Sequence, residues 1–156
     1  MRLSNLADYA VITMSQAATH CGDGRVSAAE LASETGLPVP TVQRLVSKLT
    51  AAGLLRSVRG AKGGLQLGRP AAAITVADIV EAVEGPIALT ACIEDSACCD
   101  YEAGCRMKSH WPVINDALRG ALAGITLETL RTPPASSRRV RDTLVAQDTA
   151  NREEVA

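Results

Sequence analysis

The chain has 156 residues, of which 47% are hydrophobic and 2% aromatic, and its formal net charge is −1. The hydrophobic content excludes a chain that is disordered throughout, and the length fits one domain, or one small domain with an appended helix. A net charge near zero excludes a uniformly basic coat for nucleic acid, although it leaves local patches open. The N-terminus lacks the apolar run of a signal peptide and no window approaches about 18 apolar residues, so we expect a cytoplasmic protein with no membrane segment.

Helical periodicity dominates the first fifty residues. From residue 4 to residue 20, apolar side chains recur at spacings of three and four, which predicts a helix with Ser4 as its N-cap. Ser27 and Glu30 have the spacing of a capping box, so a short second helix is expected to begin there and to end at Gly36. Because the chain has no Phe, the buried faces are expected to be aliphatic and rich in alanine.

A third helix is predicted with Pro40 in its first turn and Gly53 at its end. Its apolar residues have the i, i+3, i+4, i+7 spacing of a buried face: Val42, Leu45, Val46 and Leu49. The bridge 36–39 has about the length of the turn in a helix-turn-helix motif. The extended runs 54–58 and 65–67 enclose a Gly-rich basic tip and predict a hairpin. This order predicts a mainly α fold with a small β-hairpin wing, that is, a winged helix-turn-helix domain.

The second half of the chain predicts two further helices with a cysteine-rich loop between them. Thr75 and Asp78 begin a short helix that ends at residues 85–86. The loop that follows has roughly twenty residues, and loops of that length are commonly functional. A longer helix begins at Trp111, with a brief helical extension over 126–130. Its apolar residues form a seam suited to a partner helix: Trp111, Ile114, Leu118, Ala121, Leu122 and Ile125.

The near-zero net charge hides an uneven distribution. Residues 1–70 hold eight Lys or Arg and four Asp or Glu, a net of +4, whereas residues 71–130 hold three and nine, a net of −6. Residues 131–156 contribute +1. Between residues 36 and 77 there are six basic residues and no acidic one. A basic stripe over a recognition helix and a wing is the electrostatic pattern expected for contact with DNA phosphates.

The helix-turn-helix motif assigns a role to each polar residue of this stripe. Residues near the start of the second helix reach base edges, so Gln43 and Arg44 are the candidates for base recognition. The other polar residues of this helix are expected to hold phosphates: Thr41, Ser47 and Lys48. On the wing, Arg59 and Lys62 are expected to enter the minor groove or to grip the backbone. For any one of these residues the alternative is ordinary surface polarity.

Four of the five cysteines fall within fourteen residues, at Cys92, Cys98, Cys99 and Cys105. In a cytoplasmic setting such a cluster indicates metal binding or redox chemistry rather than structural disulfides. Thiolate sulfur suits iron–sulfur clusters and zinc, and the lack of a C-x2-C pair weakens the zinc-finger interpretation. The residues alone leave three alternatives open: an iron–sulfur cluster, a zinc site or a thiol redox switch.

Several stretches of the chain occur in the same order in one known family. They are residues 1–4 with 8–11, residues 53–55 followed by 57–64, residues 74–80, the three-cysteine loop that leads to Trp111, and residues 125–127. Together they extend over residues 1–131, and on them the chain resembles the IscR/NsrR (Rrf-two) family of bacterial transcription regulators. Residues 76–86, 89–92 and 104–105 are most similar to the branch that regulates the SUF iron–sulfur assembly operon.

The resemblance implies a dimer whose long C-terminal helices cross, with each cluster held near the dimer interface. It therefore implies that the helix beginning at Trp111 is the dimerisation element. The cysteine spacing of the branch favours Cys92, Cys99 and Cys105 as the ligands of the cluster. Cys98 is the alternative for the middle position.

The fourth ligand of the cluster is not settled by the resemblance. The IscR pattern has a His three residues after the third cysteine, but here that position is Lys108 and the nearest His is His110. The NsrR branch implies Asp8 instead, an acidic residue on the first helix that completes the cluster from the partner subunit. We expect Asp8 as fourth ligand, with His110 or a small exogenous ligand as the alternatives.

These predictions divide the chain into four parts: a winged helix-turn-helix DNA-binding domain at 1–86, a cysteine-rich cluster-binding loop at 87–110, a dimerisation helix at 111–131 and a disordered tail at 132–156. We interpret the chain as a homodimeric regulator that binds a double-stranded DNA operator of iron–sulfur assembly genes. A redox-sensitive iron–sulfur cluster, 2Fe–2S or 4Fe–4S, would gate that binding. A nitric-oxide or redox sensor of the same family and a zinc-braced interaction domain are the alternatives. An enzyme is not expected, because no nucleophile–base pair is evident and only two His are present.

Overall fold

The computed structural model describes residues 3–20, 24–60, 63–93 and 105–131. Over these residues the fold is mainly helical with one two-stranded antiparallel hairpin, which confirms the predicted fold class. The elements follow one another in this order: α1 (Asn5–Thr19), α2 (Ala28–Thr35), α3 (Val39–Ala51), β1 (Leu55–Val58), β2 (Gly64–Leu67), the short 3-10 helix η1 (Ala71–Ala73), α4 (Val76–Glu84), the 3-10 helix η2 (Ala91–Ile93), α5 (Trp111–Ala123) and α6 (Leu127–Arg131).

Side-chain caps fix where three of the helices begin. The Ser4 hydroxyl accepts hydrogen bonds from two backbone N–H groups in the first turn of α1. Ser27 and Glu30 form the predicted capping box of α2, and Thr75 and Asp78 form a second capping box at α4. Each cap satisfies N–H groups that have no partner within the helix, so the start of each helix is encoded locally.

A tight turn joins α2 to α3 and completes the helix-turn-helix motif. Gly36 ends α2 with a φ of 71°, a left-handed conformation that strains residues with a side chain. Pro38 directly precedes α3, whose inner face is made by Val42, Leu45 and Leu49, each with 0% of its surface exposed. This inner face fixes α3 against the core and leaves its opposite face outward.

The wing is the hairpin of β1 and β2, in which Leu55 lies opposite Leu67 and Val58 lies opposite Gly64. Val26, which precedes α2, exchanges two backbone hydrogen bonds with Leu65 of β2, at 3.2 Å and 2.8 Å. The wing is therefore tied by its backbone to the segment that enters the helix-turn-helix motif. The Lys62 at its tip lies outside the described residues.

The core is aliphatic and rich in alanine, as the composition predicts. Along α1 the buried residues are mainly small: Ala7, Ala10, Thr13, Met14, Ala17 and Ala18. Small side chains allow neighbouring helices to approach closely, and α1 packs against α2, α4 and α6. The larger buried side chains of the core come from several elements, with three of them, Val42, Leu45 and Leu49, on α3.

Residues 111–131 form two helices rather than one. After α5 ends at Ala123, Thr126 forms an isolated bridge with Thr75, and α6 begins at Leu127. Leu127 is fully buried, and its N–H donates to the carbonyl of Ile74 at 2.8 Å. The expected extension over 126–130 is helical, but it folds back onto α1 and η1 and belongs to the core of the winged domain. The tail beyond residue 131 lies outside the described residues.

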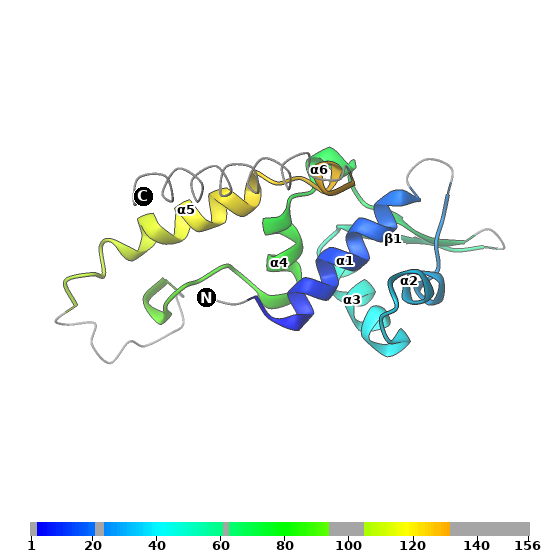
Figure 1. Cartoon of the computed structure of the whole chain (residues 1–156), viewed down its shortest axis with the longest axis horizontal. Helices are drawn as coiled ribbons and strands as arrows, with labels where there is room; N and C mark the ends of the chain where they lie inside the picture. The colour runs from blue at the N-terminus through cyan, green and yellow to red at the C-terminus, as the bar shows by residue number, and fades with distance from the viewer. Residues whose placement is uncertain (1–2, 21–23, 61–62, 94–104, 132–156) are drawn as a thin grey trace, which may run out of the picture.

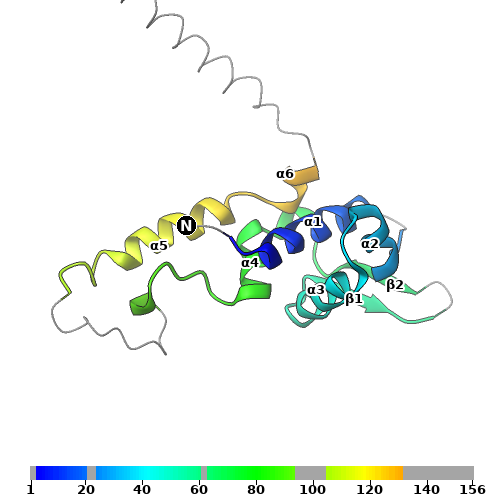
Figure 2. The same ribbon diagram turned by 60° about the horizontal axis from the view of Figure 1, so that its bottom comes forward.

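The molecule is elongated, with the wing at one end and α5 projecting at the other (Figures 1 and 2). Between them lies α4, which contacts α1, α3 and α5. Among the residues described, every helix is too short or too polar to span a bilayer. We call residues 92–105, which hold four cysteines, the cysteine segment. The helix-turn-helix motif and the two described ends of this segment lie on opposite sides of α4 (Figure 1).

Candidate nucleic-acid interface and cysteine segment

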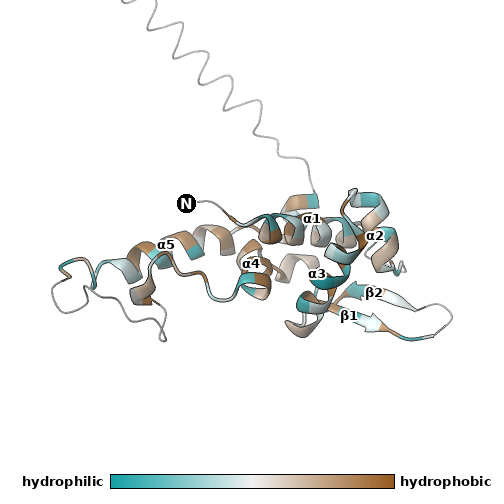
Figure 3. Ribbon diagram, turned by 90° about the horizontal axis from the view of Figure 1, so that it is seen from below, coloured by the Kyte–Doolittle hydropathy of each residue, from teal (hydrophilic) through white to brown (hydrophobic). Residues whose placement is uncertain are grey.

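The outer face of α3 carries an exposed row of residues at helical spacing. Pro40, Gln43, Arg44 and Ser47 are all exposed, and their i, i+3, i+4, i+7 spacing places them on one face. The row lies opposite the buried residues of the same helix. In Figure 3 part of α3 is coloured teal, which shows its hydrophilic residues. Gln43, Arg44 and Ser47 thus point away from the core, as a helix that enters a DNA groove requires.

The N-terminal end of α3 is open as well. Pro38 occupies the N-cap position without a side-chain cap, and the first turn holds no acidic residue. Val39, the first residue of the helix, is 42% exposed. No acidic residue of this first turn offsets the partial positive charge at the N-terminal end of α3, which would favour a nearby phosphate.

Two predicted phosphate ligands on α3 are only half exposed. Thr41 and Lys48 lie on the flanks of the helix, and both are partly buried. The Lys48 ammonium donates a hydrogen bond of 2.7 Å to the carbonyl oxygen of Val83, near the C-terminal end of α4. This ammonium already has a partner within the chain, whereas Gln43 and Arg44 face outward.

The wing contributes further basic residues. Arg56 and Arg59 are exposed at β1 and just beyond it. Arg56 lies directly opposite Gln66 in the hairpin, and the Gln66 amide, with its oxygen turned toward Arg56, accepts hydrogen bonds from the guanidinium. Because the Arg56 guanidinium is hydrogen-bonded within the hairpin, Arg59 remains the predicted DNA contact among the described residues of the wing.

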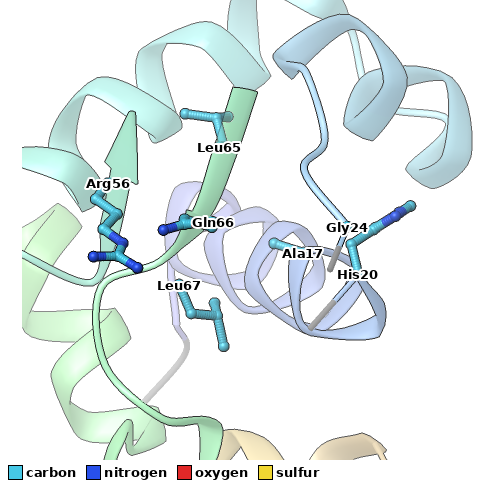
Figure 4. A pocket seen from close by; sticks show the side chains of 7 residues that line it. All are labelled: Ala17, His20, Gly24, Arg56, Leu65, Gln66 and Leu67. Atoms are coloured by element: carbon cyan, nitrogen blue, oxygen red, sulfur yellow. The ribbon is translucent and has the colours of Figure 1, made fainter. Parts of the chain in front are cut away.

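A small pocket of about 150 Å³ opens between the C-terminal end of α1 and the wing (Figure 4). Arg56 and Gln66 lie on one side of it, and Gly24 and His20 lie on the other. The His20 ring is engaged with the carboxylate of Glu34 at 2.9 Å. Polar and apolar residues both line the pocket, and its polar side chains Arg56, Gln66 and His20 already have partners, so we assign it no ligand.

The structure describes only the two ends of the cysteine segment. Cys92 lies in η2, Cys105 is half-buried in the turn before α5, and Cys98 and Cys99 lie outside the described residues. Asp8 is exposed in the first turn of α1. Within the described ranges, no three metal-ligating side chains come together. In Figures 1 and 2 the first turn of α1 and the turn before α5 lie at different places along the molecule.

The residues that lead to the cysteines, 87–89, are attached to α5 by one buried asparagine side chain. Asn115 is 5% exposed, and its side chain donates to the carbonyl of Ile87 at 2.8 Å and accepts from the N–H of Leu89 at 3.1 Å. At the far end of the segment, the turn after Cys105 runs directly into α5. Both ends of the cysteine segment are therefore attached to the same helix.

An ion pair links α5 to α4. The Arg119 guanidinium donates to both carboxylate oxygens of Glu81, at 2.7 Å and 3.0 Å. These hydrogen bonds to Glu81 raise the pKa of Arg119 further above its usual value. A bidentate pair fixes orientation as well as distance, so it helps to hold α5 in one position against α4.

Sequence reasoning did not single out Asn115, Arg119 or Glu81. The helical pattern of α5 draws attention to apolar residues, and it gives no sign that an asparagine would be the buried one. An i, i+4 pair of polar residues, Asn115 and Arg119, on a helix with an apolar seam is the signal that could have indicated a polar inner face. His110, the alternative fourth ligand, is exposed just before α5.

Comparison with known proteins places the chain among transcription regulators. The family model Rrf2, described as an iron-dependent transcriptional regulator, matches residues 3–133. The chain is 35% identical over 132 residues to the HTH-type transcriptional regulator IscR of Photorhabdus laumondii, covering 83% of this chain and 79% of the relative. The IscR of Photobacterium profundum is also 35% identical, with 83% and 75% covered.

Solved structures agree with this assignment. CymR, the global cysteine regulator of B. subtilis, superimposes with a TM-score of 0.66 at 34% identity, covering 84% of this chain and 96% of that one. The IscR of T. potens gives a TM-score of 0.62 at 32% identity, covering 83% and 85%. The matching family and the IscR relatives are described as transcriptional regulators, which confirms the expectation that the chain is not an enzyme.

Proposed function

This chain belongs to the Rrf2 family of iron-dependent transcriptional regulators, and on that premise we propose that it is a homodimer whose binding to a DNA operator is gated by an iron–sulfur cluster. The likeness to IscR supports iron–sulfur assembly genes as its targets. One observation carries the proposal: an exposed recognition face on α3 and the attached ends of a cysteine segment lie on opposite sides of the same short helix, α4. A structural change at the cysteines could therefore reach the outer face of α3 through helices that pack against one another.

In the proposed DNA complex, the outer face of α3 enters the major groove. Gln43 and Arg44 read base edges, because glutamine pairs well with adenine and arginine with guanine. Ser47 and Thr41 hold phosphates at the edge of the groove, and the open N-terminus of α3 favours a further phosphate. Arg59, together with Lys62, contacts the minor groove or the backbone from the wing.

The donor chemistry of the cysteine segment fits an iron–sulfur cluster. Its two described ends, η2 with Cys92 and the turn with Cys105, are both attached to α5, and thiolate sulfur is the usual ligand of iron in such clusters. We propose Cys92, Cys99 and Cys105 as the protein ligands, with Asp8 of the partner subunit as the fourth. A cluster of this composition would supply one iron with an exchangeable ligand, suited to sensing iron supply or oxidants.

The proposed role of Asp8 needs a dimer, since the first turn of α1 and the turn before α5 lie apart within one chain (Figure 1). The exposed large apolar residues at α5 support such a dimer: Met107, Val113, Ile114 and Ile125. Val113 is 69% exposed, which is costly for an isolated chain in water. We propose that residues 105–125 form the dimerisation surface, while α6 stays with the winged domain at residues 1–86.

The deciding experiment is anaerobic purification of the full chain, followed by its absorption spectrum and its iron and sulfide content. We expect a coloured protein with iron and acid-labile sulfide, and we expect Cys92→Ser, Cys99→Ser and Cys105→Ser to abolish both. Cys98→Ser is the matched control and should retain them. A colourless preparation that contains zinc would instead support the zinc-braced interaction domain.

Gating is tested separately by DNA binding. A duplex is selected by the chain from a random-sequence pool, and its affinity is compared for cluster-loaded and metal-free protein at one fixed salt concentration. We expect the two affinities to differ by about tenfold or more, which corresponds to a coupling of about 1.4 kcal/mol. Equal affinities would refute the proposed gating.

A further inference from the structure

Three polar contacts form a continuous path through α4, from the approach to the cysteines to the recognition helix. They are Asn115 with the backbone of Ile87 and Leu89, Arg119 with Glu81, and Lys48 with the carbonyl of Val83. Resting on the proposed function, we propose that this path is the mechanical connection between the two sites, and that Lys48 positions α3 rather than holding a DNA phosphate.

The first contact fixes the approach to the cysteines onto α5. Asn115 is the only buried residue of that helix, and it satisfies one backbone acceptor and one backbone donor of the segment before η2. Both groups belong to non-helical backbone, so without the amide they would have to find water or other partners. A displacement of residues 87–89 is thereby transferred to α5.

The second contact transfers the position of α5 to α4. Arg119 lies four residues after Asn115, so both side chains are on the same face of α5, the face toward the rest of the chain. The guanidinium binds both oxygens of the Glu81 carboxylate. Because this fork geometry resists rotation, α5 cannot slide along α4 without breaking the pair.

The third contact joins α4 to the recognition helix. The carbonyls in the last turn of a helix lack helical partners, and the Lys48 ammonium occupies one of them at Val83. A cation at this end also interacts favourably with the helix dipole. For the ammonium to bind a DNA phosphate, it would have to give up this hydrogen bond of 2.7 Å.

The helix between these contacts is suited to move as one body. α4 has nine residues, begins with a capping box and ends at Gly85. Its inner residues Ile79, Val80 and Val83 are buried in the core. A short, capped and well-packed helix does not bend easily, so a tilt imposed at Glu81 reaches Val83 and, through it, Lys48.

The role of Lys48 is tested by the salt dependence of DNA binding. Metal-free Lys48→Met protein is compared with the wild-type chain on the selected duplex over a series of salt concentrations. The logarithm of the binding constant falls linearly with the logarithm of the salt concentration. Loss of one phosphate contact makes this negative slope smaller in magnitude by about 0.9, whereas loss of a positioning contact leaves it unchanged. We expect an unchanged slope with about 2- to 30-fold weaker binding, and recovery in Lys48→Arg. A slope that is smaller in magnitude by about 0.9 would overturn the positioning role of Lys48.

The path itself is tested by a double-mutant cycle. Asn115→Ala and Lys48→Met are combined, and the affinity of metal-free protein for the same duplex is measured after circular dichroism has confirmed folding. Residues on one path should give non-additive free energies, since the second change acts on a connection that is already broken. Glu128→Gln, which breaks an exposed ion pair on α6, is the matched control. Its effect on the free energy of DNA binding should be additive with that of Lys48→Met.

If Asn115→Ala does not fold, the exposed Arg119→Met variant replaces it in the cycle. Additive free energies for the path pair would overturn the proposal. Because every measurement uses metal-free protein, the connection is judged even if the chain carries no cluster. Failure of the proposed function would be seen elsewhere, as a lack of iron or as equal affinity with and without the cluster.

Discussion

Neighbouring side chains on the outer face of α3 are expected to contribute to DNA binding in different ways. Arg44→Ala should weaken binding to the selected duplex by about 1–3 kcal/mol, because a bidentate contact to guanine is lost. Gln43→Ala should mainly relax the base preference at one position, as it removes no charge. Both are measured by titration of the duplex and of single-base variants of it. Arg131→Ala, which removes an exposed arginine of α6, is the control and should leave binding unchanged.

A second residue-scale effect concerns the link between α1 and α2. Hydrogen bonds from the side chains of His20 and Gln16 lower the pKa of Glu34 below its ordinary value of 4.5. A depressed carboxyl pKa stabilises the fold above the unfolded-state pKa, and this contribution is lost as the pH falls through the folded-state value. Glu34→Gln should therefore be less stable than wild type at neutral pH, and the difference should shrink as the pH falls below 4.5 and through the lowered pKa of Glu34. Denaturant unfolding over this pH range checks it, and a difference that persists in acid would contradict the expectation.

At the scale of the element, the stability of α2 depends on its cap. Ser27→Ala removes the hydroxyl that accepts the Glu30 N–H and should reduce the free energy of unfolding by about 1 kcal/mol. Ser33→Ala is the matched control, since Ser33 is exposed in the same helix, and it should change stability by less than about 0.5 kcal/mol. Denaturant unfolding measures both. Equal effects of the two substitutions would show that the cap is not the cause.

On the scale of the whole molecule, α5 is the helix that exposes large apolar side chains at the surface of one chain. Val113→Glu places a carboxylate on its most exposed apolar position and should weaken dimerisation at least tenfold, because burying an unpaired charge costs more than about 1.4 kcal/mol. Sedimentation velocity over a range of concentrations measures the change. Ala29→Glu, which puts the same charge on the exposed side of α2, should not alter dimerisation. A Val113→Glu protein that dimerises like wild type would place the interface elsewhere.

The winged helix-turn-helix could be predicted because its signals are local. The capping boxes at Ser27 and Thr75, the left-handed Gly36 and the buried face of α3 each arise within a few residues of chain. Such features do not depend on what packs against them, so they can be recognised before the fold is known. The outward orientation of Gln43 and Arg44 follows from the same periodicity.

Residues 111–131 show where local signals stop being sufficient. The seam from Trp111 onward is helical in period, but the spacing of its apolar residues does not predict that Asn115 is the buried residue of the helix. The separate fold of α6 arises from the pairing of Thr126 and Leu127 with the segment before α4, some fifty residues earlier in the chain. Pairing over such a separation is decided by packing.

The sequence by itself determined the helices and hairpin of the helix-turn-helix and wing, the outward face of α3 and the position of the cysteines in the chain, because periodicity, caps and charge are properties of short stretches. Only the tertiary structure decided the partner of Lys48, the attachment of the cysteine segment through Asn115 and the pairing of Arg119 with Glu81. The residues of these contacts are 35, 28 and 38 positions apart. Contacts at that range exist only once the core has brought α3, α4 and α5 together, so no local pattern can encode them.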